Sequence, residues 1–281
     1  MTAAFPSELE ALLADDVPFG DLTTAALGIG GAAGRMTFRA RGPMVVAEVE
    51  SAVALLRLAG CESVTAQTRS GASLESGAEI LTATGTAEAL HRGWKVSQTL
   101  IEAWSGVASA ARAIVEAARR VAPDIGIACT RKNTPGTKSF AARAVQAGGA
   151  SMHRLGLSES VLVFPEHRAF LADVPLAELV ARLRRAVPEK KLVIEAKSIA
   201  AALEAAAAGF DVIQAEKFSP AEVRDLVAAL KSAPKRPLVA AAGGITTENA
   251  AEYAGTGADV LVTSMPYFGR PRDVAVTIEA V

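Results

Sequence analysis

The sequence has 281 residues, 51% of them hydrophobic, and a formal net charge of -1. A chain of this kind can bury a substantial core in one large or two medium domains, and its charge excludes a global field that attracts nucleic acid or an anionic membrane. Its two cysteines, Cys61 and Cys129, lack metal-ligand spacing, which argues against a disulfide framework and a zinc site. The chain shows neither a secretory signal nor a run of roughly 18 apolar residues, so we expect a cytoplasmic protein.

The N-terminal part of the chain predicts a small α+β domain. A helix is expected to begin near Ser7, whose side chain can cap it, and to end near Asp16. From Arg35 to Arg41 apolar and polar residues alternate, which is typical of a half-buried strand. Further strands are expected at 44–49, 63–68 and 79–84, with a helix over about 51–59. These elements indicate a mostly antiparallel sheet in an N-terminal α+β sandwich domain over residues 1–110.

A different rhythm follows a long helix expected over 86–122, which Gly106 could interrupt. Apolar β runs recur at 125–129, 160–163, 192–195, 211–215, 238–242 and 259–263, and helical segments such as 200–208, 220–231 and 246–254 fill the gaps. Thr246 is expected to cap the last of these helices. Strands that alternate with helices indicate parallel βαβ units, so we predict an incomplete parallel α/β barrel of the TIM type over 111–267. The stretch 268–281 alternates again and is expected to return to the first domain as a strand.

Charged residues and glycines follow several of the expected strands. In barrels of this class catalytic groups lie at the carboxyl ends of the strands. These positions hold Arg131, Lys132, Glu195, Glu216, Gly243 and Gly244, while His153 and Arg154 come before the strand expected at 160–163. Each alone has a structural interpretation: a solvated loop, an ion pair on the rim, or a tight turn that needs glycine. Because four separate strand ends present charge or glycine at the same face of the barrel, they indicate a site for anions, namely a carboxylate and phosphates.

Four motifs together resemble one family. They are Gly20-Asp21-Leu22-Thr23-Thr24, Ser105-Gly106-Val107-Ala108-Ser109, Thr130-Arg131-Lys132-Asn133-Thr134-Pro135-Gly136 and His153-Arg154-Leu155-Gly156-Leu157. In order and spacing they are similar, along nearly the whole chain, to the nicotinate-nucleotide pyrophosphorylase family, whose best-known member is quinolinate phosphoribosyltransferase. The segment from His153 to Phe170 is more similar still to the ModD pyrophosphorylases, which are associated with molybdenum transport genes.

The resemblance implies an activity, a cofactor and a partner. The family joins a carboxylated N-heterocycle to phosphoribosyl pyrophosphate, uses Mg²⁺ and releases pyrophosphate. It also implies a homodimer whose active site takes residues from both subunits, and no nucleic acid or membrane partner. Assembly of such dimers into a hexamer is left open. Carried over to this sequence, the resemblance assigns Arg131, His153, Arg154, Lys95 and Phe164 to substrate binding, Lys132, Glu195 and Glu216 to catalysis, Glu195 and Glu216 also to the metal, and Gly243, Gly244 and Ser264 to phosphate binding.

Four positions depart from the pattern of that family. Glu216 stands where the family usually has Asp, and Lys95 stands where it has an Arg contributed across the dimer. Phe164 replaces a Lys of the acceptor pocket, and Ala240 replaces a Glu. A dicarboxylate should bind less well without the cation at position 164, whereas Phe164 could stack on a planar ring. We therefore expect a ModD-like phosphoribosyltransferase whose acceptor need not be quinolinate.

Three other interpretations stay open on the sequence. One is a true carboxylating quinolinate phosphoribosyltransferase of NAD biosynthesis. Another is a Schiff-base lyase with Lys197 or Lys217 as nucleophile, which the neighbouring acids disfavour because they keep both lysines protonated. The last is a non-catalytic binding or regulatory protein linked to molybdenum uptake, since a fold does not guarantee chemistry.

Overall fold

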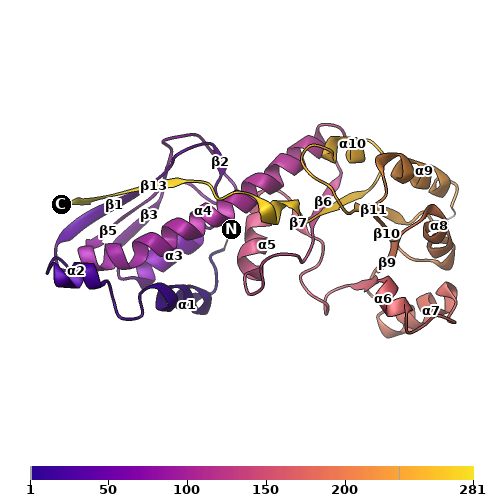
Figure 1. Cartoon of the computed structure of the whole chain (residues 1–281), viewed down its shortest axis with the longest axis horizontal. Coiled ribbons are helices and arrows are strands. Elements are labelled where there is room, and N and C mark those ends of the chain that lie inside the picture. The colour runs from indigo at the N-terminus through magenta and orange to yellow at the C-terminus, as the bar shows by residue number, and fades with distance from the viewer. Residues whose placement is uncertain (1, 234) are drawn as a thin grey trace. The chain divides into compact units, whose positions relative to one another are not determined.

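The computed structural model describes residues 2–233 and 235–281 (Figure 1). By their contacts these residues form two compact units. The antiparallel unit comprises the described part of Met1–Arg112 together with Thr134–Gly149 and Pro266–Val281, and the parallel unit comprises Ala113–Asn133 and the described part of Ala150–Met265. Residues 134–149, which the strand-helix rhythm assigns to the barrel, thus pack with the antiparallel unit. Within the described residues, no helix is both long and apolar enough to span a bilayer.

The antiparallel unit is built on a four-stranded sheet in the order β13-β1-β5-β3, with every pair antiparallel. The strands of the whole unit are β1 (Ala33–Ala40), β2 (Met44–Val45), β3 (Ser63–Ala66), β4 (Ser73–Leu74), β5 (Glu79–Thr86) and β13 (Val274–Ala280), of which β2 and β4 form a separate pair. Its helices are α1 (Pro6–Asp16), α2 (Leu22–Ala26), α3 (Val49–Leu58), most of α4 (Ala87–Arg119) and α5 (Lys138–Ala147). Met36 and Phe38 of β1 are fully buried against Leu56 of α3 and Leu90 of α4, so the alternation in β1 directs one face of the sheet to a helical layer.

Two sequence expectations in this unit are wrong in detail. Helix α1 begins at Pro6 instead of being capped by Ser7, and the carboxylate of Glu8 accepts a hydrogen bond of 3.0 Å from the Phe5 amide. Proline suits the first helical position because its missing N–H would have no partner there. Helix α4 also runs through Gly106 without a break. A Cβ at Gly106 would lie 2.5 Å from the carbonyl oxygen of Arg270, so this glycine permits the close passage of the chain before β13.

The parallel unit has a seven-stranded, wholly parallel sheet in the order β7-β6-β12-β11-β10-β9-β8. Its strands are β6 (Gly126–Cys129), β7 (Ser151–Met152), β8 (Val161–Val163), β9 (Leu192–Ala196), β10 (Val212–Glu216), β11 (Leu238–Ala242) and β12 (Val260–Thr263). Its helices are α6 (Pro165–Arg168), α7 (Leu176–Ala186), α8 (Ile199–Ala208), α9 (Pro220–Leu230) and α10 (Ala250–Ala254), and the 3-10 turn η1 (Met265–Phe268) follows β12. In the described part of the chain the two edge strands, β7 and β8, do not pair with each other, which confirms the predicted incomplete barrel. Figure 1 shows β9, β10 and β11 as neighbours.

Carboxylates at the amino ends of two strands fasten this sheet. Asp211 accepts a hydrogen bond of 2.8 Å from the Leu192 amide, and Asp259 accepts one of 2.7 Å from the Val239 amide. Burial opposes ionisation of Asp211, but hydrogen bonds, above all from Arg184, bring its pKa down to about 2. The amino ends of the strands therefore carry stabilising groups, which leaves the carboxyl ends for function.

The segment between β11 and α10 differs from the sequence expectation. Helix α10 begins at Ala250, and Thr246 does not cap it. Instead the side chain of Asn249 folds back, accepts a hydrogen bond of 2.8 Å from the Thr246 amide and donates one of 2.9 Å to the Gly244 carbonyl. An asparagine can satisfy backbone groups in this way and so competes with helix formation. Gly243 and Gly244 therefore lie in a loop and not at a helix N-terminus.

Candidate active site

The cationic loop follows β6 and is fastened at its first residue. The hydroxyls of Thr130 and Ser264 lie 2.6 Å apart, so the ends of β6 and β12 are tied together. The Lys132 amide donates a hydrogen bond of 3.3 Å to Thr130 Oγ1. This tie sets where Arg131 and Lys132 leave the sheet, and it places Ser264, the predicted phosphate ligand, at the base of the same loop.

His153 and Arg154 follow β7, at the strand end next to that loop. The His153 amide donates a hydrogen bond of 2.8 Å to the Cys129 carbonyl at the end of β6. Burial, and then the charge of Arg154, lower the pKa of His153, so its imidazole is neutral near pH 7. A neutral imidazole can both accept and donate a hydrogen bond at a binding site.

Arg154 is a buried cation, since only 6% of the residue is exposed. Burial lowers its pKa, and so does the charge of Arg131, which means that the two guanidinium groups share one electrostatic environment. Among the described residues no carboxylate forms an ion pair with Arg154. A buried charge without a partner is costly, so the arrangement favours binding of an anion between these arginines.

Phe164 lies at the end of β8 and stacks with both a cation and an imidazole. The guanidinium carbon of Arg154 lies 5.4 Å from the centroid of its ring. The ring centroids of Phe164 and His167 lie 5.9 Å apart, and the two ring planes form an angle of 18°. The His167 ring is held in place because its Nδ1 accepts a hydrogen bond of 3.0 Å from the Phe164 amide. Position 164 thus carries an aromatic ring that packs against a guanidinium group and an imidazole.

Two carboxylates project from neighbouring strands. Glu195 lies in β9 and Glu216 at the end of β10. Burial raises the pKa of Glu195, and the charge of Glu216 raises it further, while Lys197 and Lys132 lower it. Lys197 Nζ lies 4.0 Å from Glu195 Oε1. The strand ends therefore bring an acidic pair next to the cations that the sequence predicted.

The glycine pair completes this edge of the sheet. Gly243 and Gly244 have φ values of +89° and +76°, which residues with a Cβ rarely adopt. A Cβ at Gly243 would lie 2.8 Å from Lys217 Cγ and 3.0 Å from Glu216 Oε1, whereas a Cβ at Gly244 would meet nothing within 4 Å. Lys217 itself has φ +60°, and its amide donates a hydrogen bond of 2.7 Å to the Ala242 carbonyl. Gly243 thus makes room for the side chains of Glu216 and Lys217.

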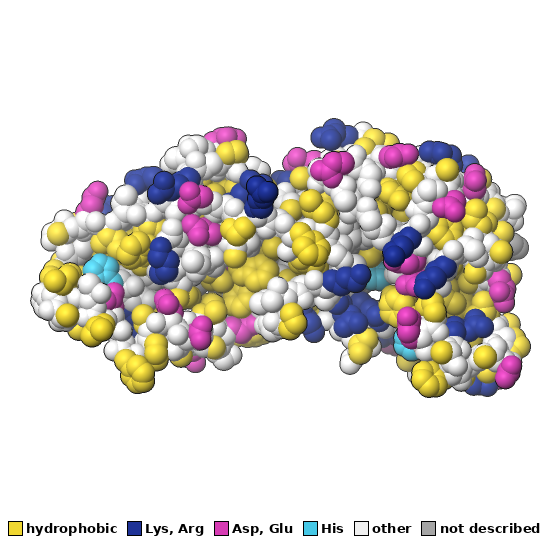
Figure 2. All heavy atoms as spheres, viewed as in Figure 1, with side chains coloured by type: hydrophobic (Ala, Val, Ile, Leu, Met, Phe, Trp, Pro, Cys, Tyr) yellow, Lys and Arg dark blue, Asp and Glu magenta, His cyan; other side chains and the backbone are white. Residues whose placement is uncertain are grey.

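Figure 2 shows Lys and Arg side chains gathered beside a histidine and acidic side chains on the part of the surface that belongs to the parallel unit. Lys95 is the exception among the predicted site residues, since it lies in α4 within the antiparallel unit. Its ammonium group donates a hydrogen bond of 2.8 Å to Gln98 and lies 4.7 Å from the centroid of the Trp94 ring. Its assignment to the site across a dimer stays a prediction.

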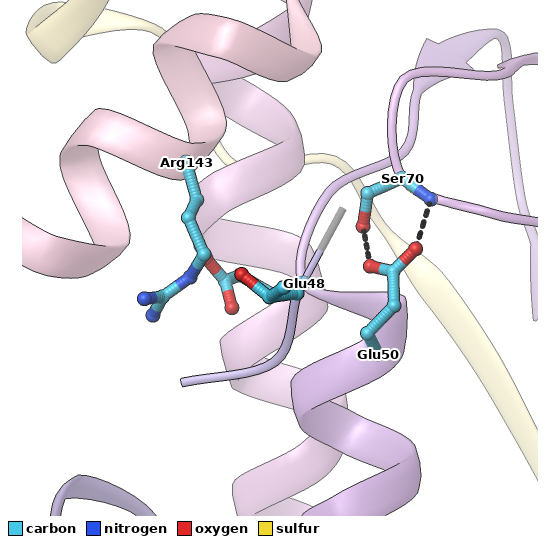
Figure 3. Close-up of a pocket in the computed structure, with 5 residues that line it drawn as sticks. Glu48, Glu50, Ser70 and Arg143 are labelled. Carbon is cyan, nitrogen blue, oxygen red and sulfur yellow. Dashed lines mark hydrogen bonds and ion pairs between the residues drawn. The ribbon is translucent and has the colours of Figure 1, made fainter. Parts of the chain in front are cut away.

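A second polar cluster lies within the antiparallel unit (Figure 3). Arg143 of α5 forms an ion pair of 2.9 Å with Glu48, whose side chain is 1% exposed. Ser51 also donates a hydrogen bond to Glu48, and Ser70 donates one to the neighbouring Glu50. The hollow between these residues is too small for a water molecule. We therefore interpret the cluster as a tie between α3 and α5 and not as a binding site.

Two polar residues near the site were given no role from the sequence. Gln214 is more than nine-tenths buried in β10 and lies between Glu195 and Glu216 in the sequence. Thr130 holds the cationic loop. The signal for Gln214 was present, because it is the one polar residue in the run Val212-Ile213-Gln214-Ala215. Thr130 gave no comparable signal, since a threonine after a strand is ordinary.

The fold and the strand-end cluster define a class, namely phosphoribosyltransferases with a half-barrel and an antiparallel accessory unit. Two family models match the chain, the N-terminal domain of quinolinate phosphoribosyl transferase over residues 21–105 and its C-terminal domain over residues 107–276. The chain belongs to the quinolinate phosphoribosyl transferase family.

Known members support this assignment and differ in how similar they are. The chain is 54% identical over 243 residues, which cover 86% of it and 93% of the relative, to a Rhodobacter capsulatus protein named "Putative pyrophosphorylase ModD". It is 31% identical over 264 residues, 92% of the chain and 87% of the relative, to the carboxylating nicotinate-nucleotide pyrophosphorylase of Rattus norvegicus. The crystal structure of NadC from Streptococcus pyogenes superimposes with a TM-score of 0.91 at 25% identity and full coverage of both chains. The predicted resemblance, fold and enzyme class are thus confirmed.

Proposed function

We propose that this protein transfers the phosphoribosyl group of phosphoribosyl pyrophosphate to a ring nitrogen of a carboxylated N-heterocycle, with release of pyrophosphate. The observation that carries the proposal is the acidic pair beside the cations at one edge of the parallel sheet. Glu195 interacts with Glu216, Lys197 and Lys132 at once. An acidic pair next to cations suits a reaction in which positive charge grows on a sugar while an anion leaves.

Each group has a part in this reaction. As the bond to pyrophosphate lengthens, positive charge develops on the ribose ring, and the carboxylates of Glu195 and Glu216 stabilise that charge. Arg131, Lys132 and Arg154 hold the phosphates and the carboxylate of the acceptor, and Ser264 with the amides of Gly243 and Gly244 binds phosphate oxygens. The ring nitrogen of the acceptor supplies the electron pair of the new bond, so no nucleophilic side chain is required.

The same carboxylates fit Mg²⁺. No group of three or more His, Cys, Asp or Glu residues in the described part of the chain could hold a metal ion. Mg²⁺ is commonly bound through one or two carboxylates together with substrate phosphates, which is what Glu195 and Glu216 offer beside a diphosphate. When bound, the ion would neutralise charge on the departing pyrophosphate.

Phe164 affects which acceptor the site can bind. It offers a stacking face next to Arg154, 5.4 Å from the guanidinium carbon, and adds no positive charge of its own. This suits a planar ring with a carboxylate placed toward Arg154, and it gives no partner to a second carboxylate on the side of Phe164. We therefore propose an acceptor other than quinolinate.

The family resemblance and the composition support a proposal for the setting of the enzyme. We propose a cytoplasmic homodimer in which Lys95 reaches the active site of the partner subunit, as the family resemblance implies. The association of ModD pyrophosphorylases with molybdenum transport genes, which the resemblance implies, extends the proposal to a role beside molybdenum transport. Apart from the second subunit, we propose only small-molecule partners.

The test is binding of Mg²⁺ and phosphoribosyl pyrophosphate by isothermal titration calorimetry, with the double variant Arg131→Ala, Arg154→Ala. We expect binding by the wild-type protein and loss of at least about a hundredfold in affinity in the variant, because hydrogen bonds to charged groups are lost. The matched control is Arg182→Ala, which removes an arginine of the same unit whose side chain is 47% exposed and forms an ion pair with Glu178. Full affinity in the double variant, or no donor binding by the wild type, would contradict the proposal.

A further inference from the structure

Gln214 shares the face of the sheet on which the acidic pair lies. In the register of the parallel sheet Gln214 is level with Glu195 of β9 and with Ala240 of β11. Its chain neighbour Ile213 is completely buried, and successive side chains in a strand point to opposite faces. Gln214 therefore lies on the same face as Glu216, two residues further along β10.

The hydrogen bonding of this side chain is incomplete. Its Nε2 donates to Glu195 Oε2 at 3.4 Å, which is at the long end for such a bond. Its Oε1 is buried and accepts no hydrogen bond from the described residues. The residue is only 6% exposed, and the methyl group of Ala240 beside it has no donor to offer. Buried polar groups are nearly always paired in native proteins, so an unpaired oxygen in a candidate site calls for a donor from outside.

The chemistry of the substrates identifies that donor. Ionised phosphates, a pyrophosphate and a carboxylate offer only acceptors, whereas the hydroxyl groups of the ribose can donate. Gln214 shares its face of the sheet with the carboxylates of Glu195 and Glu216, which are likewise acceptors when ionised. A surface made of acceptors attracts hydroxyl groups and repels phosphates.

We propose that Gln214 is a substrate-binding residue that recognises the ribose of the phosphoribosyl donor. Its Nε2 holds the carboxylate of Glu195, and its Oε1 accepts a hydrogen bond from a ribose hydroxyl. The long bond to Glu195 leaves the carboxamide free to rotate toward the ligand. This inference rests on the proposed phosphoribosyl transfer and adds to it the residue that recognises the ribose.

The experiment compares sugar analogues on the full chain. Binding of ribose 5-phosphate, 2-deoxyribose 5-phosphate and 3-deoxyribose 5-phosphate is measured by calorimetry for the wild type and for Gln214→Met, which keeps the length of the side chain and removes both polar atoms. We expect the wild type to prefer ribose 5-phosphate over one of the deoxy analogues by about tenfold, the effect of one hydrogen bond, and the Met variant to bind both equally.

Two further variants separate recognition from folding. Ile213→Val, on the opposite face of β10, is the matched control and should keep the tenfold preference. Gln214→Glu retains an acceptor oxygen and should also keep a preference for the hydroxyl, even if Gln214→Met is unstable. An unchanged preference in a folded Gln214→Met variant, or no preference in a wild type that binds phosphoribosyl pyrophosphate, would overturn the role of Gln214 alone. Absence of phosphoribosyl pyrophosphate binding by the wild type would overturn the proposed function as well.

Discussion

Replacing Gly243 by Ala tests whether the acidic pair depends on the space beside it. Both Gly243→Ala and Gly244→Ala force an alanine into a left-handed conformation, at φ +89° and +76° respectively. That conformation costs about 1–2 kcal/mol for a residue with a Cβ. Only the Cβ at position 243 would also collide, at 2.8 Å with Lys217 Cγ, 3.0 Å with Glu216 Oε1 and 3.1 Å with the Lys217 amide nitrogen.

The collision adds to the backbone cost. The Lys217 side chain is flexible and can move, but its amide is fixed by the hydrogen bond to the Ala242 carbonyl. Overpacking of this kind typically costs about 1–3 kcal/mol. We therefore expect Gly244→Ala to lose about 1–2 kcal/mol, and Gly243→Ala to lose about 2–5 kcal/mol, the sum of both terms.

Chemical denaturation of the two variants, followed by fluorescence and circular dichroism, measures this difference directly. Affinity for Mg²⁺ and phosphoribosyl pyrophosphate, measured on each folded variant, should fall further for Gly243→Ala because Glu216 is displaced. Equal stability of the two variants would refute the reasoning, since the backbone strain would then account for everything and the contact with Glu216 for nothing.

Three further predictions concern groups away from the anion site. Arg143→Met should destabilise the protein by about 3–5 kcal/mol near pH 8, because it leaves the buried carboxylate of Glu48 without its cation. Burial raises the pKa of Glu48 in the folded protein, so protonation of this carboxyl favours the native state. The loss of stability in the variant, measured by denaturation, should therefore shrink as the pH falls toward the usual glutamate range. Asp211→Asn should lower the free energy of unfolding by about 2 kcal/mol at neutral pH. The pKa of Asp211 is lowered to about 2 in the folded protein, so its stabilising effect is present above the pKa of the unfolded chain and is lost as the pH falls through about 2. The denaturation curves of variant and wild type should therefore converge in acid. Burial raises the pKa of Cys61 to about 11 and that of Cys129 to about 12, so a thiol reagent at pH 8 should label neither in the native protein and both in denaturant; labelling of the native protein would contradict their burial.

The strands were predictable because each carries its periodicity within a few residues. The run at 238–242 was expected with the bounds that β11 has, and the alternation at 35–41 led to β1. Ends of helices were less predictable because they depend on single hydrogen bonds. Asn249 bonds to the backbone at Thr246 and so delays α10, and no pattern in the sequence distinguishes that outcome from a cap at Thr246.

The candidate site was predictable to the extent that it follows strand ends. Arg131 and Glu195 come at predicted strand ends, whereas Arg154 follows β7, a two-residue strand that was not predicted, and the parallel sheet brings all three to one edge. The role of Gly106 was not predictable, because its need for a missing Cβ comes from Arg270, more than 160 residues away in the chain. The pairing of Gln214 with Glu195 likewise depends on the register of two strands, which apolar runs alone do not fix.

The most direct test of the central claim is release of pyrophosphate from phosphoribosyl pyrophosphate and Mg²⁺ across a panel of N-heterocyclic carboxylates. The panel includes quinolinate, nicotinate and related monocarboxylates, and mass spectrometry identifies the ribotide that forms. We expect pyrophosphate and ribotide in equal amounts with one planar acceptor, and loss of both in Glu195→Gln. If the folded protein binds no phosphoribosyl pyrophosphate and releases no pyrophosphate with any acceptor, the assignment as a phosphoribosyltransferase is contradicted.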